Sequence, residues 1–217
     1  MIVSNQKYYG IRLVVAAFGV LCGLTGIIAG FFEVLQGNVT TNSLVVSTIG
    51  SSYRMAGDFT YFAITIIPNF LVTGILAIIA SSLVIIWSVK FVHRKYGTIT
   101  LLLLCIIQTI VGGGWVIDLA LMMCIMSFGI GRSLEWWHSH LPEGVRTWLT
   151  KIFPISIVGF GLLSSSMLLL TIIGVNSTAL INFLSPLALL MFIPILLMIF
   201  GGISYDIRDQ QDVEDIY

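Results

Sequence analysis

The sequence has very few charged residues. They make up 9% of the 217 positions, whereas a soluble globular domain carries about 25%. Ten basic and ten acidic side chains cannot cover the wetted surface of a chain this long, which excludes a soluble enzyme. Disorder is excluded too, because it requires low hydrophobicity and high charge, and here 58% of the residues are hydrophobic with a mean hydropathy of +1.05. The sequence therefore predicts an integral membrane protein.

Net charge and cysteine are also scarce. The net charge is zero, so no basic field attracts nucleic acid, and we expect no nucleic-acid partner. The three cysteines have no paired spacing and lie in apolar runs, whereas a disulfide framework or a zinc site needs paired or loop positions. We interpret them as small buried thiols. They are Cys22, Cys105 and Cys124.

Long apolar stretches define the membrane spans. A transmembrane helix needs about 20 predominantly apolar residues. Four stretches meet this requirement directly: 11–36, 68–89, 155–174 and 180–203. The first stretch is longer than the apolar part of a secretory signal peptide, so we interpret it as a helix that remains in the membrane.

The apolar run 98–131 is too long for a single span. As one helix it would extend about 51 Å, whereas the hydrocarbon core of a bilayer is about 30 Å thick. Three consecutive glycines interrupt the run, and glycine is the residue that most readily breaks a helix. We therefore predict two short spans, 98–112 and 115–131, joined by a hairpin turn. The turn residues are Gly112, Gly113 and Gly114.

The distribution of positive charge favours six spans over five. Lys and Arg near membrane spans stay on the cytoplasmic side. With six spans and a cytoplasmic N-terminus, Arg54 is the one basic residue outside, whereas five spans divide the ten basic residues equally. We predict an all-α membrane helix bundle that forms a single domain, 1–217, with six transmembrane helices and both termini in the cytoplasm. Five spans are the alternative, and the bacterial inner membrane is the default compartment.

Three segments outside the spans have distinct compositions. The outer loop 37–67 contains apolar and β-branched residues, so it either forms a cap over the bundle or merely covers the helix ends. The inner segment 132–154 predicts an interfacial helix that ends at Pro154. The C-terminal segment 205–217 is rich in Asp and Glu, and we expect a solvated acidic tail.

Small residues recur along one side of the first span. Gly19, Gly23, Gly26 and Gly30 lie within about 60° of one another on a helix. Small residues let helix backbones approach closely in a membrane. The pattern indicates close packing, either against a helix of the same chain or against a second chain.

Two acidic residues within the spans are the candidates for function. Ionisable groups at membrane depth often mark ion or substrate sites. Glu33 and Asp118 lie at similar depth towards the outer side in the six-span arrangement, and Asn69 and Tyr61 are near them in that arrangement. Together they predict an outward-facing pocket that binds a cation or relays a proton. The alternative is that both carboxylates are wetted interface residues or helix-end partners.

The sequence carries no enzyme or cofactor signature. It lacks HExxH, GxSxG and a Walker loop, and His138 and His140 resemble a metal-ligand pair only loosely. We expect no cofactor and no metal. Transport-type binding of a solute or ion and a non-catalytic accessory subunit are the two leading functions, and a lipid-modifying enzyme is third. The expected partners are the lipid bilayer and a membrane protein or a second copy.

Overall fold

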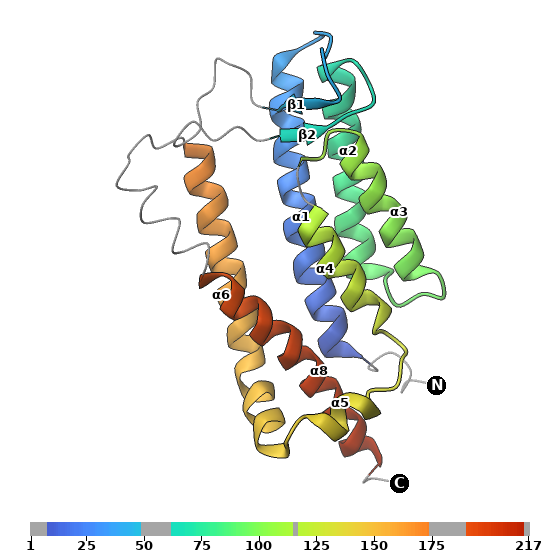
Figure 1. Ribbon diagram of the computed structural model, residues 1–217, viewed down its shortest axis with the longest axis vertical. Helices are drawn as coiled ribbons and strands as arrows, with labels where there is room; N and C mark the ends of the chain where they lie inside the picture. The colour runs from blue at the N-terminus through green and yellow to red at the C-terminus, as the bar shows by residue number, and fades with distance from the viewer. Residues whose placement is uncertain (1–7, 49–61, 115–116, 174–189, 215–217) are drawn as a thin grey trace.

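The computed structural model describes residues 8–48, 62–114, 117–173 and 190–214, and most of them are helical (Figure 1). The described elements are seven helices and one two-stranded antiparallel sheet. In chain order they are α1 (Tyr9–Gln36), β1 (Val45–Ser47), β2 (Phe62–Ile64), α2 (Phe70–Lys90), α3 (Gly97–Ile110), α4 (Ile117–Phe128), α5 (Glu135–His140), α6 (Glu143–Ile173) and α8 (Phe192–Glu214).

Three described helices are long and apolar enough to cross a membrane. They are α1, α2 and the part of α6 from Glu143 to Ser166. The helices α3 and α4 are apolar but have 14 and 12 residues, which corresponds to about 21 and 18 Å. This composition is consistent with an integral membrane protein. The end of the predicted fifth span and the start of the sixth fall in 174–189, outside the described residues.

The predicted break within 98–131 separates α3 from α4. Gly112 and Gly114 have φ angles of +94° and +81°, a region that residues with a side chain rarely adopt. The Gly112 N–H donates to the Ile64 carbonyl at 3.0 Å, and the Gly113 N–H donates to the Gln108 carbonyl at 2.8 Å. These bonds turn the chain out of the helical path and attach the turn to β2.

Helix α1 lies at the centre of the bundle and packs against α2, α4 and α8 (Figure 1). Its glycine row faces α2: side chains added at Gly19, Gly23 and Gly26 would collide with α2 residues. At Gly30 an added Cβ would lie 2.7 Å from the Gly74 carbonyl oxygen. The close neighbour of this row is therefore a helix of the same chain.

The expected helix end at Pro154 is wrong, because α6 continues through this proline without interruption. A proline inside a helix removes one backbone hydrogen bond and costs about 3 kcal/mol. Here buried side chains lie on both sides of it, at Leu149, Phe153 and Phe160. Their burial stabilises both halves of the helix, and Phe160 also packs edge-on against Phe18 of α1.

The expectation of a solvated tail is also wrong for the first residues of 205–217. Helix α8 extends to Glu214, and Asp206 is only 1% exposed. Its carboxylate accepts hydrogen bonds from the backbone N–H groups of Gly10 (2.6 Å) and Ile11 (2.9 Å). Asp206 thus caps the start of α1 from a different helix, a role that helix N-termini offer to carboxylates.

Candidate functional site

Glu33 lies near the end of α1, where α1 meets the start of α2 and the glycine turn. Its side chain is 0% exposed. The close approach of α1 and α2 at Gly30 and Gly74 brings the two backbones together one turn before Glu33. The carboxyl group is enclosed between the end of α1, Thr73 of α2 and Gly112 of the turn.

The two oxygens of Glu33 have different surroundings. Oε2 accepts a hydrogen bond of 2.8 Å from the Thr73 hydroxyl on α2, whereas Oε1 has no hydrogen-bond partner among the described residues. A Cβ added to Gly112 would lie 2.5 Å from Oε2 and 2.8 Å from Oε1. Position 112 therefore requires glycine for two reasons. Its φ angle is positive, and a side chain there would collide with the Glu33 carboxyl group.

The Thr73 hydroxyl lies near two acceptors. Its Oγ1 is 2.8 Å from Glu33 Oε2 and 3.1 Å from the Phe70 carbonyl oxygen. A hydroxyl has a single hydrogen and cannot direct it along two separate bonds. The hydrogen is therefore shared between the Glu33 carboxyl oxygen and the Phe70 carbonyl oxygen, which weakens the bond to Glu33. The Glu33 carboxyl group thus has one hydrogen-bond partner among the described residues, and it shares that partner with the α2 backbone.

The β1–β2 hairpin covers this end of α1. Gln36 Nε2 donates to the backbone carbonyls of Thr48 (2.6 Å) and Ser47 (3.3 Å), which attaches β1 to the end of α1. After β2, the Ile66 N–H donates to the Ile110 carbonyl at 3.1 Å, which attaches the chain to the end of α3. The described part of the outer loop thus joins the end of α1 to the end of α3, at the top of Figure 1.

A second buried polar group lies about three turns along α1 from Glu33. The Gln108 amide donates to the Cys22 carbonyl at 2.9 Å, and the Cys22 thiol donates to Gln108 Oε1 at 3.7 Å.

The sequence did not predict the contact between Thr73 and Glu33, because a threonine in an apolar helix usually bonds to its own backbone. Gln108 carried a signal, since it interrupts a long apolar run.

The other predicted site residues do not join Glu33 in the described structure. Asp118 is exposed on the first turn of α4, and no hydrogen bond between described residues connects it to Glu33. Asn69 is the N-cap of α2: its Oδ1 accepts from the Val72 N–H at 3.1 Å, and its Nδ2 donates to Asn38 at 2.6 Å. Tyr61 lies outside the described residues.

The two histidines of α5 make contacts within the inner segment. His140 stacks on Trp136 with ring centroids 4.3 Å apart, and His138 Nε2 lies 2.9 Å from Gln211 Nε2 of α8. Across the four described ranges, no group of three His, Cys, Asp or Glu side chains is arranged to hold a metal ion.

Asp206, at the opposite end of α1, provides an electrostatic comparison with Glu33. It lies three residues beyond the predicted span 180–203, and burial raises the pKa of its carboxyl group to about 6. The backbone N–H groups of Gly10 and Ile11 favour the charged form and oppose this shift. Both oxygens of Asp206 have backbone donors, whereas Oε1 of Glu33 has none among the described residues.

Comparisons with known proteins gave no match: no family model, no curated protein and no solved structure is similar to this chain.

Proposed function

We propose that the chain is a small membrane protein of transport type, in which Glu33 binds and releases a proton. The observation that carries the proposal is the complete burial of Glu33, whose Oε1 has no hydrogen-bond partner among the described residues. Burying a carboxylate without a counter-charge costs far more free energy than burying the neutral acid. The protonated form therefore suits the burial of Glu33.

A proton suits this site better than a metal cation does. Hard cations bind about six or more oxygen ligands. Glu33 has the Thr73 hydroxyl as its one side-chain hydrogen-bond partner among the described residues, and the glycine turn occupies the space beside it. A proton needs only one oxygen, and Oε1 is available for it.

The proposal includes the membrane arrangement. In it, six helices cross the bacterial inner membrane, both termini are cytoplasmic, and the β1–β2 hairpin lies on the outer side. Glu33 is then close to the outer surface, and a proton reaches it when the hairpin moves off the ends of α1 and α3. The hydrogen bonds from Gln36 to β1 and from Ile66 to Ile110 are the contacts that this movement breaks.

A non-catalytic accessory subunit is the second candidate. Most described serine and threonine hydroxyls on the helices donate to backbone carbonyls of their own helix, and Gln108 bonds to α1. Such bonded groups do not provide a polar path through the bundle. This observation favours a chain that packs against a partner rather than one that conducts an ion.

The test is proton flux in vesicles. The purified protein is reconstituted with a trapped pH-sensitive dye, and a potassium diffusion potential drives protons across the membrane. We expect flux above that of protein-free vesicles, and we expect Glu33→Gln to abolish it, because the amide cannot bind or release a proton. Gln has the same shape and still bonds to Thr73, so the fold should survive.

Glu135→Gln is the matched control, since it removes an exposed carboxylate of α5 and should leave the flux unchanged. Infrared spectroscopy gives a second readout, because a protonated Glu33 contributes a carboxylic-acid band that Glu33→Gln lacks. Flux equal to that of protein-free vesicles, or flux that persists in Glu33→Gln, would contradict the proposal and favour the accessory role.

A further inference from the structure

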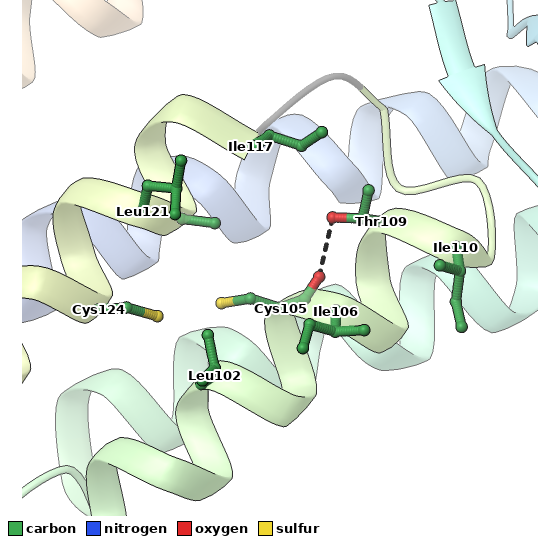
Figure 2. A pocket seen from close by; sticks show the side chains of 9 residues that line it. Leu102, Cys105, Ile106, Thr109, Ile110, Ile117, Leu121 and Cys124 are labelled. Carbon is green, nitrogen blue, oxygen red and sulfur yellow. Dashed lines mark hydrogen bonds between the residues drawn. The ribbon is translucent and has the colours of Figure 1, made fainter.

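A cavity lies between α3 and α4, away from Glu33. Its volume is about 240 Å³. Figure 2 shows side chains from both helices pointing into it. The apolar walls are formed by Leu102, Ile106 and Ile110 of α3 and by Ile117, Ala120 and Leu121 of α4.

The cavity offers no free polar group to a ligand. The Thr109 hydroxyl at its edge donates to the Cys105 carbonyl at 2.9 Å, as the dashed line in Figure 2 shows. The remaining polar groups are the thiols of Cys105 and Cys124, which behave as small apolar groups. An apolar cavity of about 150 Å³ already stays dry and binds small hydrocarbons. The ligand that this cavity favours is therefore a hydrocarbon chain.

The mouth of the cavity opens on the outer surface of the helix pair. Ile106 is 49% exposed and Leu121 is 54% exposed, although both also line the cavity. The neighbouring Leu103, Ile107 and Ile125 are exposed as well. In a membrane-spanning bundle an apolar surface of this kind faces lipid tails, so the cavity is continuous with the hydrocarbon of the bilayer.

One charged residue stands at the rim of this surface. Asp118 is exposed and precedes Leu121 by three positions, which places the two side chains next to each other on α4. The sequence from 98 to 131 contains no Lys, Arg or His and no other acidic residue. Asp118 is therefore the one charge that the segment 98–131 contributes to this rim, and a carboxylate attracts an amine and repels an anionic group.

We propose that the α3–α4 cavity binds one acyl chain of a phospholipid with a primary-amine headgroup. The chain occupies the space between Leu102, Ile106 and Ala120, and the ammonium group pairs with Asp118. The two requirements are independent, because the cavity selects the hydrocarbon and the rim charge selects the headgroup. The site shares no residue with the proposed proton site at Glu33.

The first test uses the wild-type protein. It is reconstituted in phosphatidylethanolamine vesicles in which part of the lipid carries a photoactivatable diazirine on its acyl chain, and the labelled residues are mapped by mass spectrometry. Lipids that only surround the protein label exposed side chains such as Leu83. A chain inside the cavity also labels Cys105 and Cys124, which are each only 4% exposed.

The second test separates the headgroup from the chain. Unlabelled phosphatidylethanolamine should compete with the photolabel better than phosphatidylglycerol does, by about two- to fivefold, as expected for an exposed ion pair. Asp118→Asn should remove this preference and keep the labelling, whereas Glu135→Gln, which removes an exposed carboxylate of α5, should change neither.

Ala120→Leu fills the cavity and should abolish labelling of the two cysteines, while Leu83→Phe on the exposed face of α2 should leave it unchanged. Labelling confined to exposed residues in the wild-type protein would overturn the proposal, and this result needs no variant. Equal competition by the two lipids would overturn the headgroup assignment.

Discussion

At the scale of single residues, two buried carboxyl groups lie at opposite ends of α1, and their surroundings differ. Asp206 accepts two backbone N–H bonds at the start of the helix. Glu33 has a single hydroxyl partner near the end of the helix, and its Oε1 has no donor among the described residues. The helix dipole favours negative charge at the start and disfavours it at the end. The backbone donors and the helix dipole therefore partly offset the cost of burying a charge at Asp206, whereas Glu33 has no backbone donor among the described residues.

The pKa of Asp206 predicts a pH dependence of stability. Burial raises the pKa in the folded protein to about 6 from its usual value of 3.8, so the folded state binds more protons between these values than the unfolded state. The stability that this group contributes is full below the usual pKa and is lost as the pH rises through 6. The change is on the order of 3 kcal/mol.

The measurement compares wild type and Asp206→Asn by thermal unfolding in one detergent from pH 4 to pH 8. Asn cannot titrate, so we expect the stability of wild type relative to the variant to fall as the pH rises through about 6. Other carboxyl groups titrate equally in both proteins and cancel in the difference. A difference that stays constant with pH would show that the surroundings of Asp206 are not those of a buried carboxyl group.

At the scale of secondary-structure elements, the α1–α2 pair positions Glu33. The backbones approach so closely at Gly30 and Gly74 that a Cβ on either glycine would lie 2.5–2.7 Å from the carbonyl oxygen of the other. Helix association in a membrane has little hydrophobic driving force and depends on close packing. The glycine row is therefore the feature that holds Thr73 within reach of Glu33.

Gly30→Ala and Gly159→Ala should have opposite effects on stability. Alanine has the higher helix propensity by about 1 kcal/mol, and nothing lies within 4 Å of a Cβ added to Gly159 on α6. Gly159→Ala should therefore be neutral or stabilising. Gly30→Ala should destabilise the protein by about 1–3 kcal/mol, since the added methyl group overpacks the contact with Gly74.

Thermal unfolding of both variants in the same detergent checks this prediction. The Gly159 variant reports the propensity effect alone, so the difference between the variants isolates the cost of separating α1 from α2. If Gly30→Ala were as stable as Gly159→Ala, the two helices would not be in backbone contact at Gly30.

At the scale of the whole molecule, the described ends of the chain lie at the same end of the bundle. The start of α1 and the end of α8 both lie in the lower half of Figure 1, and the paired strands β1 and β2 lie near the top. The hydrogen bonds from Gly10 and Ile11 to Asp206 hold these ends together. In the proposed membrane arrangement, these two ends lie on the same side of the membrane.

We therefore expect both termini to report the same compartment. A fluorescent protein that matures in the cytoplasm should be active when fused to either terminus, and a phosphatase that requires export should be inactive at both. A phosphatase active at the C-terminus alone would support the five-span alternative.

The sequence determined the features that depend on composition or on a few neighbouring residues. The scarcity of charge predicts a membrane environment, and the three glycines predict the turn between α3 and α4, because backbone preference and apolar length act within a few residues of the chain. The glycine row predicts a face for close packing for the same reason. The membrane character and the helix breaks thus follow from composition and spacing alone.

The tertiary structure decided which distant residues meet. The sequence predicts that Asp206 belongs to a solvated tail, yet its carboxylate caps a helix almost 200 positions earlier in the chain. Glu33 is enclosed by Thr73 and Gly112 rather than joined to Asp118, and α6 passes through Pro154 because burial on both sides outweighs the lost hydrogen bond. Each outcome depends on the packing of separate helices, and no local pattern encodes which surfaces of a bundle come into contact.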